Sequence, residues 1–240
     1  MARRDIEKKI LLFIVEGSND ETALAMPLEN LQKAYSPEGM IQFDVTHGDI
    51  TSDFNVKNVV HKVAECVKKY CKDYKLNKSD ICKVVLLLDM DGAYVPDDAI
   101  IESAQHDKAF YDKNTILHKS PSDLRKTHEL KQTRTNSLID LKHVWDGIPF
   151  NAYFVSCNLD HVICKNANLT PREKRNTADD FSLKYGEDAD GFLSFFCDSK
   201  LTIGETYDIS WDAIRQGLNS LQRFSNMNVF FSTHYPGREG

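Results

Sequence analysis

The sequence lacks several features that would assign it to a well-defined class of protein. Its six cysteines form no Cys-x-x-Cys pair, which argues against a structural zinc site and fits reduced thiols. No apolar run approaches the roughly 20 residues that a membrane-spanning helix needs. The N-terminus becomes charged before any hydrophobic region of a secretory signal peptide. We therefore expect a cytoplasmic protein that does not enter a membrane.

A nucleotide-hydrolysing motif and a basic charge balance are missing as well. No Gly-x-x-x-x-Gly-Lys-Ser/Thr stretch occurs, so the chain carries no P-loop ATPase. The net charge is −6, which argues against indiscriminate binding to nucleic acid but leaves room for a local basic surface. With 240 residues, 41% hydrophobic and 28% charged, the chain is long enough for one sizeable domain.

Strand and helix patterns alternate through the first 90 residues. Short apolar runs predict strands at residues 10–15, 41–45 and 83–88. Helical spacing of apolar residues separates them, over about 18–35 and 56–74. This βαβαβ order predicts an α/β fold of the Rossmann type, with a central, mainly parallel sheet flanked by helices.

The remainder of the chain is less regular. We expect a polar insertion at about 93–147, with a strand at 115–118 and a helix near 136–145, before a fourth strand at 148–155. Helices are predicted near 159–165, 172–185 and 211–224, and a last strand at 228–231. We interpret residues 1–240 as one domain, with its core at about 8–92 and 148–165 and a helical C-terminal elaboration at about 166–240.

Acidic residues follow two of the predicted strands directly. Glu16-Gly17 follows the first strand, and Asp89-Met-Asp91-Gly92 follows the third. Parallel strands with right-handed crossovers end at one edge of a sheet, where open α/β sheets bind ligands. His47 and Asp49, in the loop after the second strand, belong to the same edge. Carboxylates gathered at buried strand ends suggest a divalent-metal site.

The ordered pair of motifs, Glu-Gly after the first strand and Asp-x-Asp after the third, resembles the TOPRIM domain of topoisomerases, primases and OLD-family nucleases. The resemblance covers about residues 10–92 and the strand at 148–155. It implies that Glu16 is a metal ligand or a general acid/base, that Asp89 and Asp91 are metal ligands, and that the cofactor is Mg²⁺ or Mn²⁺. Asp-x-Asp in a loop can direct both side chains at one hard cation, which prefers oxygen ligands.

A further carboxylate follows the fourth strand. Ser156 and Asp160 resemble a Ser-x-x-x-Asp/Glu element of RloB-like phage-defence TOPRIM proteins, although the proline usual after the serine is missing here. The resemblance implies that Asp160 joins the catalytic cluster. The neighbouring His161 is either a ligand or acid/base group, or a histidine satisfied at a helix start.

Basic side chains that could hold a phosphate backbone lie at several points of the chain. Two clusters, at 113–134 and 165–175, contain most of them. A solvated helical face is the alternative for each cluster, and a Gly-Asp turn is the alternative for the loop at 46–51. The phosphate-binding candidates are His47, Lys119, Arg125, Lys126, Lys165 and Arg172.

These patterns favour a Mg²⁺-dependent endonuclease that hydrolyses phosphodiester bonds in RNA, such as tRNA, or in DNA. The resemblance implies an antiviral abortive-infection effector whose ATPase or sensor is a separate subunit, with a homodimer left open. One alternative is a haloacid-dehalogenase-type phosphatase with Asp89 as nucleophile and Gly186–Asp190 as a distal acidic motif. Against it, Ala93 replaces the usual Thr or Val, and two βα units precede Asp89. The other alternative is a non-catalytic, TOPRIM-derived binding subunit.

Overall fold

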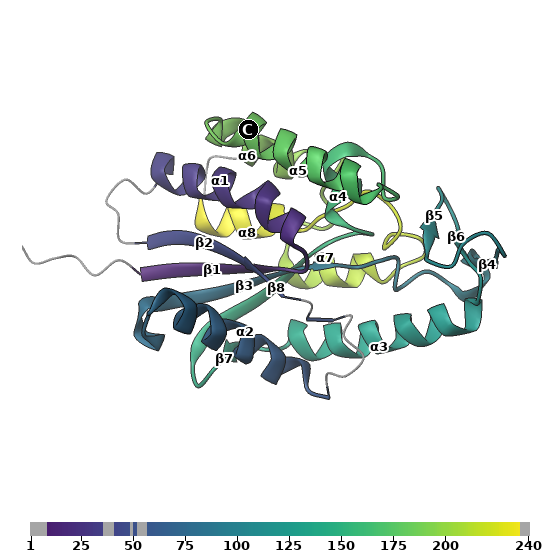
Figure 1. Ribbon diagram of the computed structural model, residues 1–240, viewed down its shortest axis with the longest axis horizontal. Coiled ribbons are helices and arrows are strands. Elements are labelled where there is room, and N and C mark those ends of the chain that lie inside the picture. The colour runs from purple at the N-terminus through teal and green to yellow at the C-terminus, as the bar shows by residue number, and fades with distance from the viewer. Residues whose placement is uncertain (1–8, 36–40, 49, 52–56, 236–240) are drawn as a thin grey trace, which may run out of the picture.

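A mixed five-stranded sheet forms the centre of the molecule (Figure 1). The computed structural model describes residues 9–35, 41–48, 50–51 and 57–235. The strand order is β2-β1-β3-β8-β7, in which the first four strands are parallel and β7 is antiparallel. The strands are β1 (Lys9–Val15), β2 (Ile41–His47), β3 (Ile81–Asp89), β7 (His143–Val144) and β8 (Ile148–Val155). The predicted α/β class with a mainly parallel sheet is confirmed.

Helices cover both faces of this sheet (Figure 1). One face packs against α1 (Ser18–Tyr35), α4 (Leu159–Cys164), α5 (Pro171–Tyr185), α6 (Ala189–Cys197) and α8 (Met227–His234). The other packs against α2 (Val59–Tyr74), α3 (Pro121–Ile139) and α7 (Tyr207–Ile214). Two 3₁₀ turns, η1 (Lys78–Asp80) and η2 (Asp97–Ala99), precede β3 and the insertion strands.

Strand β1 shows why an unbroken apolar run forms the core of such a sheet. Leu11, Phe13 and Val15 belong to the hydrophobic cluster on the α1 side. Ile10, Leu12 and Ile14 belong to the cluster on the α2 side. Successive side chains of a strand point to opposite faces, so a strand covered on both faces needs apolar residues at every position.

The polar insertion carries a second, small sheet. Its order is β4-β6-β5, made of β4 (Ile100–Glu102), β5 (Phe110–Tyr111) and β6 (Ile116–His118). The strand expected at 115–118 is confirmed by β6. The helix expected near 136–145 is wrong in its bounds, because α3 begins at Pro121 after the cap position Ser120 and ends at Ile139. Trp145 and Asp146 then have positive φ angles of 40° and 57°, which belong to a turn.

The strand expected at 228–231 is wrong, because these residues lie in α8. Asn226, at the start of that helix, accepts a hydrogen bond from the Phe154 backbone N–H (2.7 Å) and donates to Ser210 Oγ (3.0 Å). The free edge of β8 is therefore occupied by a side chain. Phe230 and Phe231 pack into the α1-side cluster. An apolar run of four residues does not distinguish a strand from a short buried helix.

The helix expected at 211–224 is also wrong in its bounds. Helix α7 ends at Ile214, where the Asn219 side chain donates to the Ala213 carbonyl (2.8 Å). Gly217 then adopts a φ of +53°, a left-handed conformation that closes the turn. Helix α6 was not predicted at all. No helix in the part of the chain that the structure describes is long and apolar enough to cross a membrane.

Candidate active site

The carboxyl ends of β1, β3 and β8 meet at one edge of the sheet. The backbone register pairs Ile14 with Leu86 and Asp89 with Val155. Glu16, one residue beyond β1, therefore lies beside the end of β3. Helix α1 begins at the same edge (Figure 1). The predicted convergence of the first-strand and third-strand acids follows directly from this register.

The turn after β3 directs Asp91 into this edge. Asp91 has a φ of 50° and Gly92 a φ of +68°, so two consecutive left-handed residues reverse the chain. The backbone N–H groups of Met90 and Asp91 donate to the carbonyls of Val155 (3.0 Å) and Cys157 (2.7 Å). These bonds fix the Asp-x-Asp turn against the end of β8.

Lys131 lies between Glu16 and Asp91. Its side chain, only 4% exposed, reaches from α3 to form ion pairs with Asp91 Oδ2 and with Glu16 Oε2 (3.4 Å). Thr51 Oγ1 donates to the other carboxylate oxygen of Glu16. Arg134, one helical turn further along α3, donates to the Thr51 carbonyl. Helix α3 of the insertion therefore supplies the cation that balances two of the strand-end acids.

A second, partly buried ion pair lies on the α4 side of the same edge. Lys174 Nζ contacts Asp160 Oδ2 at 2.7 Å, and Asp160 itself is buried. The backbone N–H of Leu159 donates to Asp89 Oδ1 (3.2 Å), which ties the start of α4 to β3. Asp20, in the first turn of α1, accepts a hydrogen bond from the Gly17 N–H (2.9 Å). The negative charge of Asp160 is close enough to raise the pKa of Asp20.

The charges of this cluster are unevenly balanced. Burial raises the pKa of Asp89 well above its usual range, and the charges of Asp20, Glu16 and Asp91 add to that effect. Burial and the charge of Asp160 raise the pKa of Asp20 to about 7, although the Gly17 hydrogen bond opposes the shift. Burial also raises the pKa of Glu16, against the lowering effect of Lys131. Five carboxylates face two lysines, so additional positive charge would stabilise the ionised cluster.

The chemistry of these donors fits a hard divalent cation. Glu16, Asp89 and Asp91 offer only oxygen atoms, the ligands that Mg²⁺ and Mn²⁺ prefer. Among the described residues, the one hydrogen bond to the Asp89 side chain comes from the Leu159 backbone, so its second oxygen is available. Among the described residues, no three acids, histidines or cysteines are arranged so that they could hold a metal ion as they stand. Lys131 holds Glu16 and Asp91 in the arrangement seen here.

A cleft of about 940 Å³ opens onto Asp89 and Asp91. The first turns of α1 and α5 form one wall, and the insertion residues 105–111 form the other. Tyr111, from β5, reaches the floor, where its hydroxyl donates to Asp91 Oδ1 (3.3 Å). The cleft gives a substrate access to these two acids.

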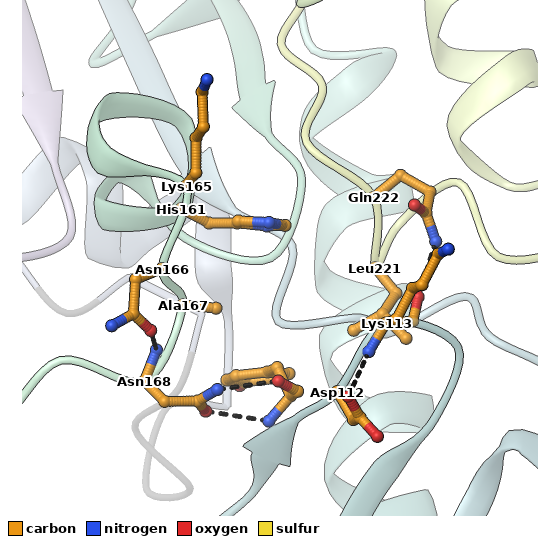
Figure 2. A pocket seen from close by; sticks show the side chains of 10 residues that line it. Asp112, Lys113, His161, Lys165, Asn166, Ala167, Asn168, Leu221 and Gln222 are labelled. Carbon is orange, nitrogen blue, oxygen red and sulfur yellow. Dashed lines mark hydrogen bonds between the residues drawn. The ribbon is translucent and has the colours of Figure 1, made fainter.

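A smaller pocket of about 270 Å³ adjoins the cleft and shares Tyr111, Ala167 and Asn168 with it. Figure 2 shows His161 extending across this pocket below Lys165. His161 Nδ1 is buried without a hydrogen-bond partner in the described chain. Burial and the nearby Arg223 lower the pKa of His161. The side chains of Asp160 and His161 therefore belong to different sites: Asp160 to the acidic cluster and His161 to the smaller pocket.

The other phosphate-binding candidates lie on the surface and do not converge. His47 pairs with Glu21, Lys119 with Asp107 (2.9 Å), Arg125 with Asp97 (3.6 Å) and Lys126 with Asp123 (3.4 Å). Arg172 is exposed in the first turn of α5, and Lys165 lines the smaller pocket. Asp49 lies outside the described residues. The segment 113–134 is not one basic face, since Lys131 and Arg134 are buried.

Several residues of the site were missed by sequence reasoning. Asp20 was interpreted only as a favourable acid in the first turn of a helix. Lys131 and Lys174 were recognised only as members of basic clusters. Tyr111 and Thr51 carried no sequence signal. The four-residue spacing between Glu16 and Asp20 across a strand-to-helix turn could have identified Asp20, because both side chains then face the same strand ends.

Comparisons with protein-family models, with curated proteins and with solved structures return no match. The function is therefore inferred from the sequence motifs, the fold and the geometry of the site.

Proposed function

We propose that the chain is a divalent-metal-dependent nuclease of the TOPRIM type that hydrolyses phosphodiester bonds in RNA or DNA. The observation that carries this proposal is the gathering of Glu16, Asp89, Asp91 and Asp160 at the ends of β1, β3 and β8, beside an open cleft. The buried Lys131 and the half-buried Lys174 accompany them. Acids and cations together suit a reaction in which negative charge moves between oxygen atoms.

The roles follow from position. Glu16, Asp89 and Asp91 would hold Mg²⁺ or Mn²⁺, which supplies a Lewis acid and lowers the pKa of a bound water. Glu16, whose pKa burial raises, is suited to accept a proton from an attacking water. Lys131 and Lys174 lie where they can balance charge that develops on a phosphate. Asp160 orients Lys174 through their 2.7 Å ion pair.

The phosphatase alternative has less support. Its distal acidic motif, Gly186–Asp190, lies along α1 away from the site, with Gly186 beside the Met26 side chain and Asp190 accepting a hydrogen bond from the Tyr35 hydroxyl. Helix α1 runs from Ser18 to Tyr35, so at about 1.5 Å per residue even Met26 is roughly 12 Å from the start of the helix at the acids. Gly186–Asp190 therefore cannot serve a reaction at Asp89 in this arrangement.

The test is a cleavage assay on total RNA and plasmid DNA with Mg²⁺, Mn²⁺ or EDTA. We expect cleavage with either metal, none with EDTA, and loss of activity by at least about a hundredfold in Asp89→Asn and Glu16→Gln. The matched controls Asp73→Asn and Glu29→Gln, which change exposed helix acids, should cleave like the wild type. Hydrolysis of a small phosphomonoester that tolerates Glu16→Gln would favour the phosphatase. Absence of metal-dependent cleavage would favour a binding subunit.

The resemblance to small phage-defence proteins supports a biological setting for this activity. We extend the proposal to a cytoplasmic abortive-infection effector that works with a separate ATPase or sensor subunit. No Gly-x-x-x-x-Gly-Lys-Ser/Thr stretch occurs in these 240 residues. Phage challenge of bacteria that express the chain with and without a candidate ATPase subunit tests this extension.

A further inference from the structure

One large apolar side chain is exposed inside the cleft itself. Phe110 is 39% exposed and lines the cleft that opens onto Asp89 and Asp91. The other large hydrophobic residues exposed by the described chain, such as Tyr74, lie outside the cleft. An exposed ring beside polar and charged groups loses hydrophobic stabilisation unless a ligand covers it.

The ring of Phe110 is held in place from several sides. The His106 ring packs against it, with centroids 4.8 Å apart and planes tilted by 42°. Ser103 Oγ fixes that imidazole through a 2.7 Å hydrogen bond to Nδ1. The next residue, Tyr111, is clamped by Asn168, which accepts its N–H (2.9 Å) and donates to its carbonyl (2.7 Å), as the dashed lines of Figure 2 show.

The same two-residue strand connects the exposed ring to the acidic cluster. Phe110 borders the cleft, and the hydroxyl of its neighbour Tyr111 donates to Asp91 (3.3 Å). A group stacked on Phe110 would therefore be placed at a set position relative to Asp91. This is the arrangement expected of a subsite that orients one part of a substrate while another part reacts.

Positively charged side chains line the same cleft as this ring. Lys108 lies two residues before Phe110, and Arg175 comes from α5 on the opposite wall. Neither side chain forms an ion pair with another residue in the described ranges. A groove that combines unpaired cations with an exposed aromatic ring is typical of sites that bind single-stranded nucleic acid.

We propose that Phe110, supported by His106, is a stacking platform for an unpaired base, so that the cleft takes single-stranded nucleic acid. The inference rests on the proposed function and deepens it by naming the substrate class. In a duplex both faces of each base are already stacked, so an aromatic side chain gains contact only with a base that is unpaired or splayed out. Lys108 and Arg175 contact the flanking phosphates.

The test measures binding in EDTA, where metal-dependent cleavage cannot occur. Single-stranded RNA and DNA oligonucleotides containing 2-aminopurine are titrated with the protein, and anisotropy and 2-aminopurine quenching are recorded. We expect quenching by the wild type, at least tenfold tighter binding of single strands than of the matching duplex, and a five- to hundredfold weaker affinity for Phe110→Leu. Phe110→Tyr, which keeps an aromatic face, should retain the wild-type affinity and quenching.

Tyr74→Leu is the matched control, because it removes an exposed ring (63% exposed) on α2. The platform is overturned if Phe110→Leu binds as tightly as Tyr74→Leu, if the duplex binds as well as the single strand, or if no oligonucleotide binds. Binding is separate from hydrolysis, so the two proposals fail independently. Cleavage that is insensitive to Phe110→Leu refutes the platform alone, and ring-dependent binding without cleavage refutes the nuclease alone.

Discussion

Lys131 is the residue whose environment most directly reports on the acidic cluster. Burial alone would lower its pKa, but the charges of Asp91 and Glu16 outweigh that effect and raise it. The lysine therefore stays charged. It contacts Glu16 and Asp91, two of the carboxylates that are proposed to hold the metal. Its position explains how the acids remain buried together in the protein described here.

Replacing Lys131 with Met should destabilise the metal-free protein by about 2–4 kcal/mol, because the largely buried Glu16 and the partly exposed Asp91 lose their cation. Mn²⁺ should then stabilise this variant more than it stabilises the wild type, since the added cation replaces the missing charge. Urea unfolding at pH 7.5, with EDTA or Mn²⁺, measures both effects. Lys69→Met, which removes an exposed helix pair with Asp73, should leave the midpoint nearly unchanged. Equal Mn²⁺ effects on Lys131→Met and wild type would be inconsistent with this role.

Asp20 predicts a pH dependence of stability. Its pKa rises from 3.8 to about 7 in the folded protein, so between about pH 4 and 7 the folded state retains a proton that the unfolded chain releases. Stability is then lost as the pH rises through this window, by up to about 4 kcal/mol. Asp20→Asn mimics the protonated side chain and should lose less stability than the wild type over this window, because only Asp89 and Glu16 then contribute to the loss. Urea unfolding at a series of pH values in EDTA compares the two proteins, and parallel curves would refute the assignment.

The strand-end acids could be predicted from the sequence, whereas their partners could not. Glu16, Asp89 and Asp91 each follow an apolar run, and parallel strands bring such ends together without any knowledge of side-chain packing. Lys131 and Lys174 lie on helices whose rotation about the sheet decides whether a lysine points to solvent or to the core. Nothing in a local charge pattern distinguishes these two outcomes.

At the scale of elements, the turn after β3 is where backbone conformation controls the site. Gly92 has a φ of +68°, and a Cβ there would lie 2.6 Å from Ile116 Cδ1. Ile116 is fully buried in the insertion cluster with Leu124 and Leu221, so its side chain has little freedom to move away. The turn and the insertion sheet are thus packed as one unit.

Gly92→Ala should therefore lower the free energy of unfolding by about 2–4 kcal/mol, through a left-handed alanine and the clash with Ile116. It should also reduce cleavage, because Asp91 is the preceding residue of the same turn. Gly217→Ala is the matched control, since Gly217 also has a positive φ (+53°) but its Cβ would meet nothing within 4 Å. That variant should lose only about 1 kcal/mol. Thermal and urea unfolding provide the comparison, and equal losses would exclude a role for the clash.

Element prediction succeeded where periodicity was long and failed where it was short. The first three strands and the helices between them were predicted because each apolar pattern extends over a full element. Helix α8 was mistaken for a strand because its apolar core spans four residues, and only the Asn226 bonds to β8 and Ser210 decide its geometry. Helix α3 was placed too late because its mean character is polar and its start depends on Ser120-Pro121.

At the scale of the whole molecule, the order of strands in the sheet brings the acidic residues of the site together. The strands that carry the acids, β1, β3 and β8, are neighbours in the order β2-β1-β3-β8-β7. The insertion returns through α3 to supply Lys131, and α5 supplies Lys174 from the opposite face. The open α/β architecture could be predicted from the alternation of elements. The closure of the insertion over the edge could not, because its contacts are long-range.

Direct binding of Mn²⁺ is the measurement that tests the central claim, that the strand-end acids form a divalent-cation site. Electron paramagnetic resonance at pH 7.5 counts free Mn²⁺ as protein is added. We expect saturable binding by the wild type, a loss of at least tenfold in affinity for Asp89→Asn and for Glu16→Gln, and wild-type binding by the surface control Asp73→Asn. Mn²⁺ binding that is absent from the wild type, or unchanged in Asp89→Asn, would contradict the account.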